Sequence, residues 1–140
     1  MDECFPWAFV DGASQGRTWS GGAGGILHLS ISHSIHFVAS LGDVSNNSTE
    51  FAAIKVLLCL SHSIGILHLH IYGDSKLVIN SLKLGKPPWN IFLLPLYDDI
   101  DRIRVHFQRI IFTHICQECN SEADLLSKKS LLLRTGYMDK

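Results

Sequence analysis

The sequence has almost no excess charge of either sign. Its 12 Lys and Arg residues are nearly matched by 13 Asp and Glu residues, which gives a formal net charge of −1. A dedicated nucleic-acid-binding protein usually carries a basic excess or a basic patch, whereas the basic residues here are dispersed along the chain. If the chain binds nucleic acid, we therefore expect bulk electrostatic attraction to contribute modestly and the affinity to be weak.

Long apolar runs, internal repeats and linkers are also missing. No apolar stretch is long enough to cross a bilayer, so we expect no membrane association. The segment 1–7 lacks the basic start and apolar stretch of a secretory signal, which leaves the cytoplasm or the nucleus as the default location. The length of 140 residues suits one compact domain over 1–140, with a core over about 7–133.

Cysteine is scarce, and its spacing carries little chemistry. Cys116 and Cys119 form a C-x-x-C pair that could be redox-active or half of a zinc site. No second C-x-x-C or H-x-x-x-H pair completes a zinc tetrahedron, so we interpret the pair as having neither role. Cys59 lies in an apolar helical stretch and is interpreted as a small buried hydrophobe.

Strand patterns fill the first third of the chain. An apolar run over 7–13 ends near Asp11, and the glycine-rich segment 14–22 is typical of a turn region. Segments 24–32 and 36–41 have the composition of two further strands. Three successive strands with tight connections predict an antiparallel meander.

Helical periodicity begins further along. Apolar residues recur at helical spacing over 49–62, and the polar segment 46–49 offers N-cap residues. The remaining patterns predict a strand over 66–72, a short helix over 76–82, a helix over 89–105 interrupted at Pro95, a strand over 109–114, and a last helix over 121–133 that ends near Gly136.

The predicted order of elements is β-β-β-α-β-α-α-β-α. A meander followed by β-α-β crossovers implies an α/β fold with one mixed five-stranded sheet. Three strands of that sheet would be antiparallel and the last two parallel, with helices against the faces.

Four acidic residues stand where predicted elements end or begin. Asp11 ends the first strand and Asp74 the fourth, whereas Glu50 opens the first long helix and Asp124 the last. The carboxyl ends of parallel strands and the starts of adjoining helices face one crevice, so we expect the four carboxylates to converge. We expect divalent metal ions to offset their mutual repulsion. Each acid taken alone has a simpler explanation, as a cap or a turn residue.

The motifs around these acids resemble type 1 ribonuclease H domains, particularly the plant branch related to retrotransposon reverse-transcriptase ribonuclease H. The resemblance covers the chain from Phe9 to about Leu132 and implies a ribonuclease H-like fold. It rests on Phe-Val-Asp-Gly at 9–12, Gly-Gly-Ala-Gly-Gly-Ile-Leu at 21–27, Asn-Asn-x-x-Glu at 46–50, Tyr-Gly-Asp-Ser-Lys-Leu-Val at 72–78, and His114 followed by Asn-Ser-Glu-Ala-Asp at 120–124.

The resemblance implies hydrolysis of the RNA strand of RNA–DNA hybrids with two Mg²⁺ ions, or with Mn²⁺ in their place. Asp11 would bridge both ions, Asp74 would complete one metal site, and Glu50 and Asp124 would complete the other. His114 would assist proton movement or product release. The implied substrate contacts are made by Gly12, Asn46, Asn47, Ser75 and Asn120.

The resemblance also implies a monomer, or a domain of a larger reverse-transcriptase-type polyprotein. Gln117 replaces an arginine that is usual in the plant branch, which removes a phosphate-pairing charge. The basic handle of bacterial relatives is missing, and only Lys83 and Lys86 remain in its place. Two alternatives therefore stay open: a non-catalytic module that binds nucleic acid or protein, and a transposable-element fragment with no independent role.

Two further patterns admit more than one interpretation. His68 and His70 share one face of a predicted strand, and without a third metal ligand we interpret them as partly exposed strand residues. Trp89 follows two prolines and is interpreted as an anchor for the next helix. The alternative for Trp89 is stacking on a nucleotide base or sugar.

Overall fold

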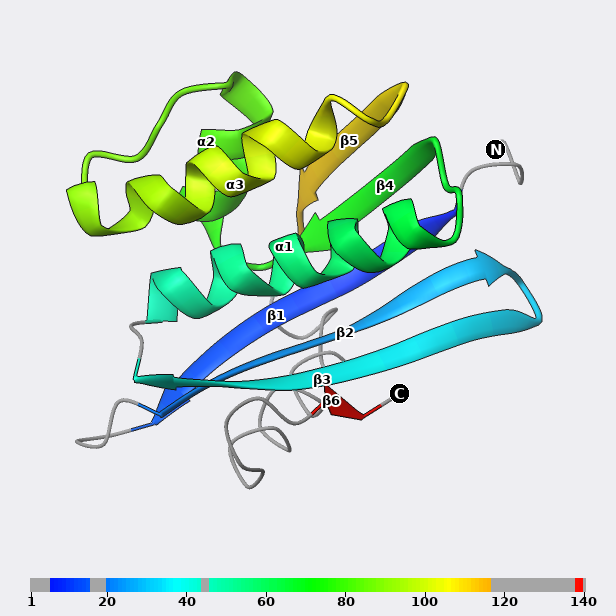
Figure 1. Cartoon of the computed structure of the whole chain (residues 1–140), viewed down its shortest axis with the longest axis horizontal. Coiled ribbons are helices and arrows are strands. Elements are labelled where there is room, and N and C mark those ends of the chain that lie inside the picture. The colour runs from blue at the N-terminus through cyan, green and yellow to red at the C-terminus, as the bar shows by residue number, and fades with distance from the viewer. Residues whose placement is uncertain (1–5, 16–19, 44–45, 117–137, 140) are drawn as a thin grey trace.

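A mixed β-sheet lies at the centre of the fold, and helix α1 runs along one of its faces (Figure 1). The computed structural model describes residues 6–15, 20–43, 46–116 and 138–139. The elements in chain order are β1 (Trp7–Gln15), β2 (Ser20–Ser30), β3 (His33–Asp43), α1 (Asn46–Ser63), β4 (His68–Gly73), α2 (Lys76–Leu84), the 3₁₀ helix η2 (Ile91–Leu93), α3 (Leu94–Arg104), β5 (Arg109–His114) and β6 (Met138–Asp139).

The sheet has the strand order β5-β4-β1-β2-β3-β6. Strands β1, β2 and β3 pair antiparallel, and β4 and β5 add parallel to β1. The predicted mixed five-stranded sheet is therefore confirmed. The two-residue strand β6, which pairs with Val38 and Ala39 of β3, was not predicted because so short a segment carries no pattern.

Strands β1 and β2 are longer than predicted and take up much of the segment 14–22, which was predicted as a turn. Their ladder continues to Gln15 and Ser20. Gly25 of β2 allows close packing, because a Cβ there would lie 2.5 Å from Cζ of Phe37 and 2.8 Å from the carbonyl oxygen of Phe9. A glycine-rich composition suits both a turn and a closely packed strand, so it does not separate the two.

Helix α1 begins at Asn46, three residues before the predicted start. The polar segment 46–49 therefore lies inside the helix, and Glu50 falls in the second turn instead of opening the helix. Asn, Ser and Thr suit both a cap and a first turn, so composition does not locate this boundary. The buried face of α1 packs over β1 and β2 and contributes Phe51, Ala53, Ile54, Leu57 and Leu58 to the core.

The prediction that Cys59 is buried is wrong, because its side chain is exposed. It follows Leu57 and Leu58, which both face the core with no exposed surface. One further residue turns the side chain about 100° around the helix axis, onto the outward face. Cys116 is also exposed, and Cys119 lies outside the described residues.

Helix α2 begins and ends with local signals. Ser75 is its N-cap, and the Oγ atom accepts a hydrogen bond from the backbone N–H of Val78 at 3.4 Å. Gly85 ends the helix in the left-handed conformation, with φ of 68°. The helix packs against β5 and extends two residues beyond the predicted 76–82.

The predicted helix over 89–105 is shorter than expected. Helix α3 begins at Leu94, with Pro95 in its first turn, where a missing N–H is tolerated. Asn90 caps the preceding η2 through Oδ1, which accepts from the N–H of Phe92 at 2.9 Å. Leu93 then anchors the turn and is 1% exposed, while Trp89 is fully exposed. The interpretation of Trp89 as the anchor is therefore wrong.

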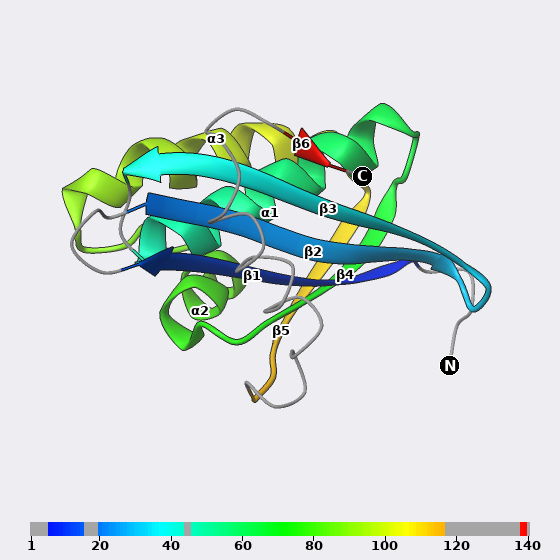
Figure 2. The same ribbon diagram turned by 90° about the horizontal axis from the view of Figure 1, so that it is seen from below.

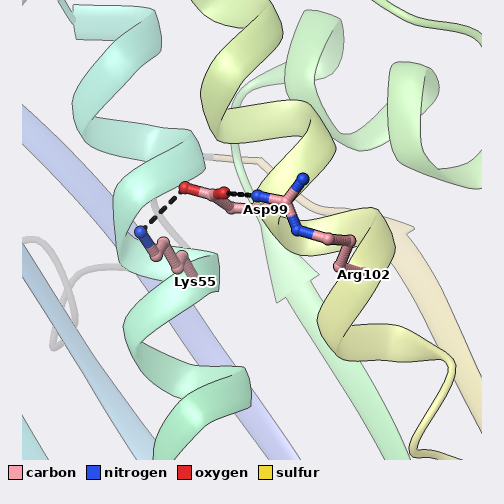
Figure 3. Close-up of polar contacts among 3 residues, drawn as sticks. All are labelled: Lys55, Asp99 and Arg102. Atoms are coloured by element: carbon pink, nitrogen blue, oxygen red, sulfur yellow. Dashed lines mark hydrogen bonds and ion pairs between the residues drawn. The ribbon is translucent and has the colours of Figure 1, made fainter.

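An ion-pair group joins α1 to α3 (Figure 3). Lys55 Nζ lies 2.9 Å from Asp99 Oδ2, and the guanidinium of Arg102 contacts the other oxygen of the same carboxylate. The hydrogen bond from Lys55 is the main cause that lowers the pKa of Asp99 below its ordinary value. This bridge links the helix that carries Glu50 to α3.

Several aromatic rings stack on the sheet face that carries Phe9 and His70. Figure 2 shows the molecule turned by 90° from the view of Figure 1. The ring of Tyr72 stacks on Phe9 with centroids 5.1 Å apart and on His70 at 4.3 Å. His70 Nε2 pairs with Thr113 Oγ1 at 2.7 Å, and burial lowers the pKa of His70. His68 and His70 are half-buried on one face of β4, as predicted.

The predicted final helix over 121–133 and its end near Gly136 lie outside the described residues. Among the residues that the structure describes, no helix combines the length and apolar character needed to cross a bilayer.

Candidate active site

Two of the predicted acids come from neighbouring parallel strands. Val10 of β1 pairs with Gly73 of β4, so the next residues, Asp11 and Asp74, stand side by side where β4 ends. Asp11 was predicted to end β1, but β1 continues to Gln15 in its pairing with β2. Asp11 lies just beyond the last residue of β1 that pairs with β4, so β1 has no paired strand on that side from Asp11 onward.

Helix α1 supplies the third acid. Glu50 lies in the second turn of α1, which packs across β1. One carboxylate oxygen from each of Asp11, Glu50 and Asp74 lies within 4.8 Å of the others. Asp11 is 5% exposed and Glu50 is 2% exposed, whereas Asp74 is half-buried. The predicted convergence is therefore found for these three acids, and Asp124 lies outside the described residues.

Gly73 shapes this cluster, although sequence reasoning did not single it out. A Cβ at this position would lie 3.1 Å from Oε2 of Glu50 and 3.1 Å from Cδ1 of Ile79. Both distances are shorter than ordinary van der Waals contact. The only sign of this role in the sequence is that a glycine immediately precedes Asp74. Its lack of a side chain leaves the space that the Glu50 carboxylate occupies.

His114 stands beside the cluster at the end of β5. It pairs in register with Gly73, and its Nε2 lies 3.2 Å from the backbone oxygen of Asp74. A carbonyl oxygen only accepts hydrogen bonds, so Nε2 donates and Nδ1 of the neutral ring is left as an acceptor. The side chain is exposed. The structure thus places His114 next to Asp74. The role that the resemblance implies for His114 stays a prediction.

The predicted substrate contacts lie around the same edge. Gly12 follows Asp11 in β1, and Asn46 and Asn47 form the first turn of α1. Ser75 follows Asp74 and caps α2. Asn120 lies outside the described residues.

The donor set of the cluster fits a hard divalent cation. Carboxylate oxygens are the ligands that Mg²⁺ and Mn²⁺ prefer in proteins, and imidazole and thiolate ligands are absent from the described cluster. Three carboxylates this close repel one another when all are ionised. A bound cation would remove that repulsion, so the residues present fit a metal site.

Comparison with known proteins gives a consistent result. The family model described as reverse transcriptase-like matches residues 9–130. No curated protein sequence matches. Among solved structures, ribonuclease H1 from Halobacterium salinarum has a TM-score of 0.82 at 24% identity and covers 90% of this chain and 96% of its own.

Two other solved structures have the same fold. LC11-RNase H1 in complex with an RNA/DNA hybrid has a TM-score of 0.82 at 20% identity, with 90% of this chain and 96% of that chain covered. The N-terminal ribonuclease H domain of a Mycobacterium tuberculosis protein has a TM-score of 0.80 at 22% identity, with 91% and 94% covered. The chain therefore belongs to the reverse transcriptase-like family and has the ribonuclease H fold.

Proposed function

We propose that this domain is a metal-dependent endonuclease that hydrolyses the RNA strand of RNA–DNA hybrids. The observation that carries the proposal is the convergence of Asp11, Glu50 and Asp74 beside the C-terminal end of β4. A protein of the same fold, LC11-RNase H1, was crystallised with such a hybrid, which supports the choice of substrate. The carboxylate donor set also supports the proposal, because it fits the divalent metal ions that assist phosphodiester hydrolysis.

The proposed cofactor is a pair of Mg²⁺ ions, with Mn²⁺ as a substitute. Asp11 would bridge both ions, Asp74 would complete one site, and Glu50 and Asp124 would complete the other. When bound, such a pair makes a water nucleophilic at neutral pH and stabilises the leaving oxygen. The nearly buried positions of Asp11 and Glu50 hold their oxygens in place and limit exchange with solvent.

His114 is proposed to move a proton during the reaction or to assist product release. Its Nε2 is held by the Asp74 carbonyl, so Nδ1 is the atom that would accept and release the proton. The exposed position allows the ring to return that proton to solvent. The interaction with Asp74 keeps the ring beside the cluster.

Substrate contacts are proposed for Gly12, Asn46, Asn47, Ser75 and Asn120. The Oγ atom of Ser75 accepts from the N–H of Val78. Its hydroxyl hydrogen would donate to a phosphate oxygen of the substrate. Contacts with sugar, phosphate and groove shape would make the cleavage independent of base sequence.

The test is cleavage of a hybrid that carries different labels on its RNA and DNA strands. In Mg²⁺ we expect the wild-type chain to cut only the RNA strand. Asp74→Asn should reduce the rate by more than about 100-fold, because it removes a metal ligand from the reacting centre. Asp98→Asn is the matched control, since Asp98 is an exposed acid on α3, outside the cluster.

Circular dichroism and thermal unfolding of both variants establish that the fold is kept. A folded wild-type chain that cuts no hybrid in Mg²⁺ or Mn²⁺ would overturn the proposal, and so would equal rates for Asp74→Asn and the wild type.

A further inference from the structure

The connection between α2 and α3 presents large apolar side chains to solvent. Trp89 is fully exposed, Phe92 is 81% exposed and Ile91 is 68% exposed. No other Trp, Tyr or Phe among the described side chains is exposed to this degree. An exposed group of this kind is a typical sign of a binding surface.

The exposure follows from an ordered backbone. Gly85 turns the chain out of α2, and the N–H of Lys86 donates to the carbonyl of Ser81 at 3.0 Å. At the other end Asn90 caps η2, and Leu93 is buried against the core. Two prolines stiffen the segment between these anchors. The rings are therefore held outward before any ligand arrives, which reduces the entropy lost on binding.

The same stretch is locally basic. Between Asp74 and Asp98 the sequence has three lysines and no acidic residue, although the whole chain has a net charge of −1. Lys83 and Lys86 are both exposed and stand just before the exposed rings. Positive charge beside exposed aromatic faces complements a flexible polyanion with stacking groups.

The connection between α2 and α3 lies towards the end of the molecule where α1 begins, as Figures 1 and 2 both show, and η2 contacts α1. Glu50 lies in the second turn of α1. A nucleic acid strand that leaves the carboxylate cluster towards this end would pass the exposed rings.

We propose that Trp89 and Phe92 stack on unpaired bases of single-stranded DNA, with Lys83 and Lys86 contacting its phosphates. Aromatic rings need free base faces, and a duplex keeps those faces stacked within itself. Removal of RNA from a hybrid leaves the DNA strand unpaired, so DNA is the strand available here. The link to hybrid cleavage rests on the proposed function, whereas binding of the single strand does not.

The direct test is binding of a fluorescent single-stranded DNA of about 12 nucleotides, measured by anisotropy at low salt. Trp89→Ala should weaken binding about tenfold, as expected for the loss of one stacked base. Val105→Ala is the matched control, because Val105 is 75% exposed at the end of α3. It should bind like the wild type. Joint replacement Lys83→Gln and Lys86→Gln should lower the salt slope of log K by roughly 1.4.

Any of three binding results would overturn the proposal: equal binding by the wild type and Trp89→Ala, absence of binding by the wild type, or a Trp89→Ala effect confined to self-association on size exclusion. A preference of more than about tenfold for RNA of the same sequence is a fourth, because the proposal assigns this surface to the DNA strand.

A second arm separates this inference from the proposed function. Cleavage is compared between a blunt hybrid and one with a single-stranded DNA extension, for the wild type and Trp89→Ala. We expect only the wild type to favour the extended hybrid. If the wild type binds single strands and cuts neither hybrid, the endonuclease proposal fails and this inference stands. If the wild type cuts both hybrids equally and Trp89→Ala binds single strands like the wild type, this inference fails and the endonuclease proposal stands.

Discussion

Gly73 controls the space available to the Glu50 carboxylate. It sits one residue before Asp74, and any Cβ there would meet both Oε2 of Glu50 and Cδ1 of Ile79 at 3.1 Å. One residue therefore couples the spacing of the acids to the packing of α2, because Ile79 is fully buried in that helix.

Gly73→Ala should disturb metal binding more than folding. We expect overpacking to lower the free energy of unfolding by about 1–3 kcal/mol. We also expect weaker Mg²⁺ stabilisation, because the Glu50 oxygen must shift. Urea unfolding with and without Mg²⁺ measures both effects.

A second variant separates the two contacts of that Cβ. Adding Ile79→Val to Gly73→Ala relieves the apolar contact alone. It should recover part of the stability and none of the Mg²⁺ effect. Full recovery of Mg²⁺ stabilisation in the double variant would show that Glu50 was not displaced.

At the scale of elements, the bridge from α1 to α3 depends on the ionised form of Asp99. Lys55 and Arg102 both approach its carboxylate, and the hydrogen bond from Lys55 is the main cause of its lowered pKa. A carboxyl whose pKa is lower in the folded chain adds stability above its unfolded pKa. That contribution disappears as the pH falls through the folded value.

Asp99→Asn should therefore reduce stability in a pH-dependent way. The difference in unfolding free energy from the wild type should be constant at neutral pH and shrink as the pH falls below 3.8, the ordinary value of this carboxyl. Denaturant unfolding at several pH values measures it, with Asp98→Asn as the control. A difference that persists unchanged well below that pH would contradict the assignment of the bridge to charge.

Element patterns explain which parts of the fold were predictable. Strand β5 matches its predicted range because a short apolar run, Ile110 to Phe112, is bounded by polar residues at both ends. The start of α1 and the continuation of β1 were missed, because Asn, Ser, Thr and Gly suit more than one local structure. Cys59 was misplaced because its burial depends on which face of α1 it occupies, and Trp89 because it lies before η2 and α3 and outside both helices. Composition specifies neither.

At the scale of the whole molecule, the candidate site follows from topology. Asp11 and Asp74 are far apart in sequence, and parallel pairing of β1 with β4 brings them together. That convergence was predictable, since the rule for parallel strands needs only the order of elements. The role of Gly73 was not predictable, because it depends on distances to Glu50 and Ile79 that only the folded chain defines.

The central claim is that this carboxylate cluster holds divalent metal. The most direct measurement is calorimetric titration of Mn²⁺ into the wild-type chain, Asp11→Asn and Asp98→Asn. We predict binding by the wild type and the Asp98 variant, and at least about tenfold weaker binding by Asp11→Asn, because Asp11 is the ligand proposed to contact both ions. Equal Mn²⁺ affinity in all three proteins would contradict the account.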